Sequence, residues 1–254
     1  WAWNQSRGWK IKRTVDKMFV ILPFEKEFYK KFNFEVDFVG HPLLDAIDNF
    51  SSSKKTFEDF TKENGLENKP LVALLPGSRK QEINAMLPLM VSVKKYFPGY
   101  QFVIAAAPSL SKNYYERFVG NDLPILHGKT YELLQHSSAA LVTSGTATLE
   151  TALFEVPEVV CYKGNFFSYQ IARNLVKVNF ISLVNLLMEK ELVKELIQKN
   201  YNVKNLKTEL EKILDNKIFR SQMLEGFKIL KTKLGGAGAS ANTARLMLKT
   251  LKKE

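Results

Sequence analysis

The stretch PLVALLPGSRKQEI, residues 70–83, decides the fold of this chain. Its apolar run, residues 71–75, predicts a strand. A Gly-Ser turn follows, and an amphipathic helical pattern begins at about Arg79. Arg79 and Lys80 therefore stand at the positive end of a helix, where cations are normally disfavoured. The pattern predicts either an anion bound in the turn or a purely structural arrangement in which Glu82 offsets part of the charge.

The same strand–turn–helix pattern continues along the chain. Short apolar strands that alternate with helices indicate βαβ units and a parallel α/β sheet. The sequence predicts strands at 71–75, 101–106, 123–126, 139–142 and 158–162, with helices at about 80–97, 110–118, 129–136, 145–155 and 166–176. The last part predicts a strand at 180–184 and helices at 191–198, 205–215, 217–234 and 238–252. Before residue 50, strands are expected at 18–23 and 36–40, and the polar segment SSSKKT that follows marks a domain boundary.

Composition describes an ordinary globular protein with a basic tail. Apolar residues make up 45% of the 254 residues and charged residues 25%, and no apolar run is long enough to span a bilayer. The net charge is +11, and residues 191–254 carry 14 basic and 7 acidic side chains, an excess of +7. A basic tail can favour anionic lipid or nucleic acid. Solvated helix faces rich in lysine explain it equally well, and we favour that interpretation.

The turn after the first strand of this sheet predicts an anion site. Gly77 lets the backbone approach a ligand, Ser78 can cap the helix, and the guanidinium fork of Arg79 suits a phosphate. The structural alternative is a capping box, because Ser78 and Gln81 have its spacing. That alternative explains Ser78 and Gln81 but leaves the two cations unexplained.

A second turn of this kind lies in ALVTSGTATLE, residues 140–150. Ser144, Gly145 and Thr146 follow a predicted strand and open a helix, so their N–H and O–H groups can form a nest for phosphate. Glu150 lies about one turn inside that helix and lacks a capping partner, since Ala147 precedes it by three residues. It is therefore a candidate acceptor for two vicinal hydroxyls, such as those of a ribose. Two such turns at one end of a sheet indicate a nucleotide diphosphate.

Two further observations bear on the chemistry. Asn185 stands between a predicted strand and a helix, where it can cap the helix or contact a base or sugar. The spacing does not decide between these roles. No His, Cys or Asp cluster has the spacing of a metal site, so neither a metal nor a cofactor is predicted.

Several motifs in one order resemble the lipid-A-disaccharide synthase family. They are WAWNQSRGWKIKR (1–13), FVGHPLLD (38–45), LLPGSRKQEI (74–83), TSGTATLETAL (143–153), NFISLVNLL (179–187) and ELVKELIQ (191–198). The resemblance implies a metal-independent inverting glycosyltransferase of GT-B architecture, with two Rossmann-like domains. It implies transfer of 2,3-diacylglucosamine from its UDP derivative to 2,3-diacylglucosamine 1-phosphate, which yields UDP and the lipid A disaccharide 1-phosphate. It also implies a place at the cytoplasmic face of the inner membrane of Gram-negative bacteria.

The resemblance carries functional roles onto Arg79, Glu150 and Asn185, which we expect to be the catalytic positions. Arg79 and the two helix ends would stabilise the charge of the leaving UDP, Glu150 would hold the ribose, and Asn185 would orient part of the donor. Val184 departs from the family, which usually has Pro there. The chain is expected to be truncated at its N-terminus, so that the general base lies outside it and the fragment itself is inactive.

The resemblance also implies a domain plan. Residues 1–48 would end the acceptor-binding domain, 49–215 would form the UDP-sugar-binding domain, and the helices of 216–254 would pack back toward the first domain or be exchanged in a homodimer. Three alternatives stay open: another GT-B UDP-sugar enzyme, such as an epimerase or a peptidoglycan glycosyltransferase; a nucleotide-binding module without catalysis; and a nucleic-acid binder, which the charge alone favours.

Overall fold

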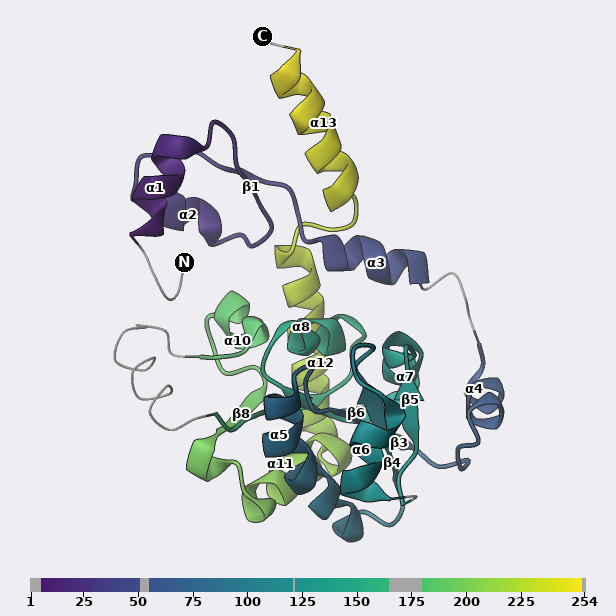
Figure 1. Cartoon of the computed structure of the whole chain (residues 1–254). Helices are drawn as coiled ribbons and strands as arrows, with labels where there is room; N and C mark the ends of the chain where they lie inside the picture. Colours follow the sequence, from purple (N-terminus) through teal and green to yellow (C-terminus); the bar gives the residue numbers. More distant parts are fainter. Residues whose placement is uncertain (1–5, 51–54, 121, 165–179, 253–254) are drawn as a thin grey trace.

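A six-stranded parallel sheet lies at the centre of the computed structural model, which describes residues 6–50, 55–120, 122–164 and 180–252 (Figure 1). The strands lie in the order β5-β4-β3-β6-β7-β8, and every neighbouring pair is parallel. The chain order therefore reverses between β3 and β6, the position at which open α/β sheets bind ligands. The strands are β3 (Leu71–Leu75), β4 (Gln101–Ala106), β5 (Ile125–His127), β6 (Ser137–Thr143), β7 (Glu158–Tyr162) and β8 (Lys194–Ile197).

Helices precede, connect and follow these strands in the chain and cover both faces of the sheet. They are α4 (Phe57–Glu63), α5 (Lys80–Ser92), α6 (Lys112–Val119), α7 (Thr130–Gln135), α8 (Thr146–Leu153), α10 (Leu183–Met188), α11 (Val203–Asp215) and α12 (Lys217–Lys233), with short 3₁₀ turns at Lys94–Tyr96 and Gln198–Asn200. The five predicted strands between residues 71 and 162 and the helices at 205–215 and 217–234 are confirmed. The helix predicted at 166–176 lies outside the described residues.

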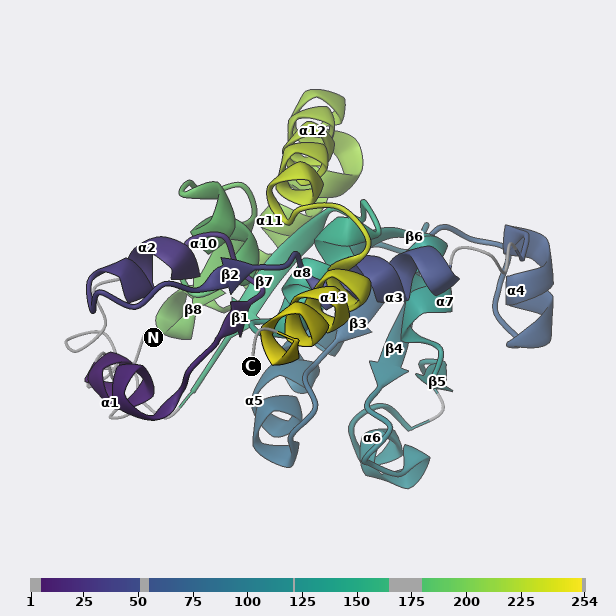
Figure 2. The same ribbon diagram turned by 90° about the horizontal axis from the view of Figure 1, so that it is seen from above.

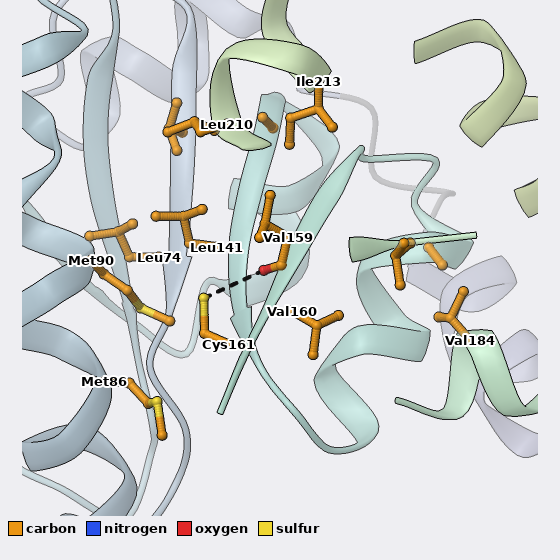
Figure 3. Packing of buried hydrophobic residues seen from close by; sticks show 14 of the residues in the cluster. Leu74, Met86, Met90, Leu141, Val159, Val160, Cys161, Val184, Leu210 and Ile213 are labelled. Atoms are coloured by element: carbon orange, nitrogen blue, oxygen red, sulfur yellow. Dashed lines mark hydrogen bonds between the residues drawn. The ribbon is translucent and has the colours of Figure 1, made fainter. Parts of the chain in front are cut away.

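The sequence of β3 is apolar throughout because its alternate residues are buried on opposite faces of the sheet. All five residues are buried. Val72 and Leu74 join the larger hydrophobic cluster on one face, whereas Leu71, Ala73 and Leu75 join a second cluster on the other face. Figure 3 shows Leu74 beside Leu141 of β6, with Met86 and Met90 of α5 on one side and Leu210 and Ile213 of α11 on another. A strand covered on both faces has no position for a polar side chain.

The first part of the chain forms a smaller unit above the main sheet. It contains α1 (Arg7–Thr14), β1 (Phe19–Val20), α2 (Glu25–Lys30), β2 (Asp37–Phe38) and α3 (Pro42–Phe50), and β1 pairs with β2 in parallel. Its own cluster of buried residues is small and centres on Val20, Tyr29 and Val36. In Figures 1 and 2 this unit lies on the same side of the sheet as the last helix, α13 (Ala239–Leu251).

Helix α3 packs with the larger unit. Its buried side chains Leu44 and Ile47 belong to the cluster that also contains the sheet and α5. Asp45 accepts hydrogen bonds from the backbone N–H groups of Gly238 and Ser240, so α3 also holds the start of α13. The domain boundaries at 48 and 215 stay predictions. The buried side chains of α3 pack with residues that follow this helix in the chain.

Two predicted elements are wrong, and one polar network explains both. Residues 180–184 were expected to form a strand, but Ser182 caps α10 by accepting the N–H of Asn185. Residues 191–198 were expected to form a helix, but 194–197 extend the sheet as β8. In that strand the carboxylate of Glu195 accepts the N–H groups of Ile181 and Ser182 and an N–H of the Asn185 amide. These contacts are made between segments distant in the sequence, so they override the local helical spacing.

Glu158, the first residue of β7, is a buried carboxyl without a hydrogen-bond partner among the described residues. Burial raises the pKa of this group well above 4.5, and the neighbouring Glu195 carboxylate raises it further. The folded chain therefore keeps a proton that the unfolded chain has released. Stability is expected to fall as pH rises from about 4.5 toward the raised pKa.

Replacing Glu158 by Gln should remove this loss of stability. We expect the free energy of unfolding, measured by urea titration between pH 5 and pH 8, to decline with pH in the native chain and to decline less in the Glu158→Gln variant. Glu225→Gln, at a position exposed on α12, is the control and should keep the native slope. Equal slopes in the native chain and Glu158→Gln would contradict the assignment.

Candidate functional site

One pocket joins the two glycine turns that follow β3 and β6. It has a volume of about 660 Å³, and both turns line it together with the ends of β4 and β5. The turns meet because β3 and β6 are parallel neighbours, with Leu75 paired to Val142, so their carboxyl ends lie at the same edge of the sheet. The pocket brings together Gly77, Ser78, Arg79, Ser144, Gly145, Thr146 and Glu150 from the predicted set.

The positive charge at the turn after β3 is largely neutralised by Glu82, a residue of the helix that follows the turn. Glu82 accepts the backbone N–H groups of Ser78 and Arg79 through Oε2, at 3.0 and 3.2 Å, and the Arg79 guanidinium through Oε1, at 2.8 Å. Glu82, and not Gln81, is thus the residue that caps this helix. The carboxylate offers a structural answer to Arg79 at the helix end, whereas the ammonium of Lys80 lies over the Tyr114 ring, 5.6 Å from its centroid. The Arg79 side chain nevertheless stays 79% exposed, so most of its donors face the pocket and solvent.

Gly77 makes this arrangement possible. Its φ of +105° lies in a region that favours glycine. A Cβ at this position would lie 2.6 Å from Oε2 of Glu82 and 2.7 Å from its Cβ. The glycine is therefore required by the close approach of Glu82 as well as by the turn.

The turn after β6 differs because no side chain among the described residues caps its helix. Gly145 is the N-cap residue of α8 and makes no side-chain cap, and Thr146 and Ala147, whose N–H groups begin the helix, line the pocket. The hydroxyl of Ser144 donates to the carbonyl of Ile181 at 3.0 Å, so its proton is not offered to a ligand as the sequence suggested. The donors of this nest are thus mainly backbone groups.

Glu150 lines the pocket and is held by one aromatic residue. The hydroxyl of Tyr131 donates to its Oε1 at 3.2 Å. Burial raises the pKa of Glu150, and the hydrogen bond from Tyr131 opposes that rise. Burial and the nearby carboxylate also raise the pKa of Tyr131 to about 12, so this group is a donor at neutral pH.

Asn185 does not line the pocket. It is fully buried in the α10–β8 region, and its side-chain amide donates to the Val193 carbonyl and to Glu195. Its carbonyl oxygen accepts the N–H groups of Leu192 and Val193. The sequence left two roles open for Asn185, one within the protein and one in contact with a ligand. This geometry favours the role within the protein, in which the amide fixes the loop between α10 and β8.

A third turn at the same edge of the sheet was not predicted as part of the site. Gly128 and Lys129, between β5 and α7, line the pocket together with Thr130 and Tyr131 of α7 and with Phe50 of α3. Lys129 donates to the Asn64 side chain at 2.7 Å. The predicted strand at 123–126 and helix at 129–136 already enclosed this turn, so the rule used for the other two would have found it. Within the described ranges, no three His, Cys, Asp or Glu side chains are grouped closely enough to hold a metal ion.

One protein family and many curated relatives match this chain. The family described as Lipid-A-disaccharide synthetase matches residues 1–241. A lipid-A-disaccharide synthase from Syntrophus aciditrophicus is 38% identical over 262 residues, which cover 100% of this chain and 67% of that protein. The synthase from Myxococcus xanthus is 37% identical over 259 residues, which cover 99% and 67%. The chain thus spans about two thirds of the length of these relatives.

The fold is shared with solved structures of low sequence identity. A UDP-GlcNAc 2-epimerase from Neisseria meningitidis, solved with bound UDP-GlcNAc, superposes with a TM-score of 0.62 at 15% identity. The match covers 94% of this chain and 62% of that one. With the two parallel sheets, this likeness confirms the predicted α/β fold of GT-B type.

Gly77→Ala tests the packing of the first turn. We expect the free energy of unfolding to fall by about 1–3 kcal/mol, because the variant strains the backbone and displaces Glu82. Gly99→Ala is the matched control, since a Cβ there meets no atom within 4 Å. Chemical denaturation of both variants measures the difference, and equal stabilities would contradict the close contact with Glu82.

Proposed function

The chain belongs to the lipid-A-disaccharide synthase family, and we propose that its pocket binds the UDP part of a UDP-2,3-diacylglucosamine donor. The sugar would pass to 2,3-diacylglucosamine 1-phosphate, giving lipid A disaccharide 1-phosphate and UDP. The observation that carries this proposal is the meeting of two glycine turns, one guanidinium and one partly buried carboxylate in a single pocket. Its volume of about 660 Å³ suits a ligand of nucleotide size.

The diphosphate fits best at the start of α8. The N–H groups of Thr146 and Ala147 lie there without a capping side chain, and the helix dipole adds a positive field. The exposed guanidinium of Arg79 lines the same pocket. As the glycosidic bond breaks, negative charge gathers on the UDP leaving group, and these fixed donors would stabilise it. In other transferases a divalent ion supplies this stabilisation.

Glu150 is proposed to accept the two vicinal hydroxyls of the ribose. Its depth in the pocket and its contact with Tyr131 support this role, because a carboxylate held in one orientation can accept both hydrogen bonds. Asn185 is proposed to act on the donor indirectly, by fixing the α10–β8 loop. Ser144 ties that region to the β6 turn through Ile181.

The general base is proposed to lie outside the described residues. Each of the three carboxylates that line the pocket already contacts a partner: Glu82 binds Arg79, Glu132 lies 3.6 Å from Lys55, and Glu150 accepts Tyr131. A free base near the acceptor hydroxyl would therefore come from another part of the enzyme.

The acylated substrates lead us to propose that the reaction takes place at a membrane surface, on the cytoplasmic side of the inner membrane. The net charge of +11 suits anionic headgroups. None of the described helices is long and apolar enough to cross a membrane. Met247, Leu248 and Leu251 of α13 are exposed and would suit contact with lipid or with a second subunit.

Arg79→Ala should weaken the binding of UDP to the chain about ten- to a hundredfold, because a charge-assisted hydrogen bond to phosphate is lost. Calorimetric titration in the presence of a chelator measures this change. Arg117→Ala is the matched control: that guanidinium stacks on Tyr114, outside the pocket, and its removal should leave the affinity unchanged. Unchanged affinity in Arg79→Ala would remove Arg79 from the site.

The 254-residue chain is expected to bind UDP without making disaccharide. Product is measured after incubation with UDP-2,3-diacylglucosamine and 2,3-diacylglucosamine 1-phosphate, and the synthase from Syntrophus aciditrophicus serves as the positive control. Disaccharide formed by the chain alone would show that its base lies within these residues. A failure to bind UDP at all would overturn the proposed function.

A further inference from the structure

Glu150 needs a fixed orientation if it is to select a diol, and Tyr131 provides it. The carboxylate carries no ion-paired cation among the described residues, and the Tyr131 hydroxyl reaches its Oε1 at 3.2 Å. This bond occupies one oxygen and leaves Oε2 and the remaining lone pairs for a ligand. The two residues come from different helices, α8 and α7, so the geometry depends on how those helices and the Tyr131 ring are packed.

The Tyr131 ring is held by two phenylalanines. Phe154 follows Glu150 by one helical turn, and its ring centroid lies 5.0 Å from that of Tyr131. Phe50 meets the same ring edge-on at 5.5 Å and meets Phe154 at 5.9 Å. The three rings form a closed aromatic trio, with two edge-to-face contacts made by Phe50 and a tilted contact between Tyr131 and Phe154. Phe50, Tyr131 and Glu150 all line the pocket.

Phe50 is the one member of this trio that lies outside the strand–helix repeats of the sheet. It is the last residue of α3, the helix that ends the smaller N-terminal unit. The helix is anchored at its middle by the buried side chains of Leu44 and Ile47, and Asp45 binds the start of α13. Phe50 is therefore carried by a helix that is fixed at several points.

We propose that Tyr131 and Phe50 are positioning residues that orient Glu150 for a vicinal diol, so that α3 takes part in the selection of ribose over deoxyribose nucleotides. This inference rests on the proposed function, because it assumes that UDP occupies the pocket. Tyr131 acts directly through its hydroxyl, and Phe50 acts through the ring of Tyr131. A carboxylate that can turn freely would accept one hydroxyl nearly as well as two, whereas a fixed one favours the pair.

The test compares UDP with 2′-deoxy-UDP by calorimetric titration of the 254-residue chain. We expect the native chain to bind UDP at least about tenfold more tightly, since the deoxy ligand leaves a hydrogen bond to a carboxylate unmade. In Tyr131→Phe and Phe50→Leu the ratio of the two affinities should fall to about threefold or less. A general loss of packing would weaken the binding of both ligands and leave the ratio of their affinities unchanged.

A second aromatic pair provides matched controls. Tyr114 and Phe118 on α6 also meet edge-on, at 5.9 Å, but neither lines the pocket. Tyr114→Phe and Phe118→Leu should keep the native ratio, and thermal unfolding establishes that all four variants are folded.

The outcomes separate the two proposals. A native chain that does not bind UDP contradicts the proposed function. A native chain that binds both ligands equally contradicts the ribose role of Glu150. A native chain that discriminates, with the ratio retained in Tyr131→Phe and Phe50→Leu, overturns the positioning role alone. If one of these variants fails to fold, the ratio measured in the other decides.

Discussion

The parallel pairing of β3 with β6 is the constraint on which the candidate site depends. The two strands are neighbours in the sheet but not in the sequence, and Leu74 pairs with Leu141 and Leu75 with Val142. Burial of both faces of β3 fixes this pairing, because a shift by one residue would exchange the side chains between two different clusters. The turns at Gly77 and Gly145 therefore leave the sheet side by side. An arrangement with β6 at an edge would separate them and leave no common pocket.

The two turns present their positive charge in different ways. At α5 the carboxylate of Glu82 takes up the first N–H groups and one donor of Arg79, so this helix end is largely neutralised while the guanidinium is held in place. At α8 the helix end has no capping side chain within the part of the chain that the structure describes. Dipole effects at such ends amount to about 0.3–1 kcal/mol each, and charge-assisted hydrogen bonds add to them. We infer that α8 supplies the backbone donors and that α5 chiefly supplies an oriented Arg79.

Local sequence patterns predicted those strands and turns whose structure is determined by a short segment alone. The apolar run at 71–75 gave the central strand, and the glycine turns pointed to one edge of the sheet. What failed was set by contacts between distant segments: β8 forms at 194–197 because Glu195 binds Ile181, Ser182 and Asn185 across the sheet edge. Glu82 was foreseen only as a partial offset to the dipole, since its reach to the turn depends on the φ of Gly77. The contact of Phe50 with Tyr131 joins residues 81 positions apart, and no local signal reveals it.

The central claim is that backbone donors of α8 and the guanidinium of Arg79 hold a diphosphate without a divalent ion. A crystal structure of the chain with UDP, grown in the presence of a chelator, tests it most directly. The account predicts phosphate oxygens within hydrogen-bond distance of the Thr146 and Ala147 N–H groups and of Arg79, with the ribose hydroxyls at Glu150. A diphosphate bound elsewhere, or UDP that enters this pocket only with a metal ion, would contradict it.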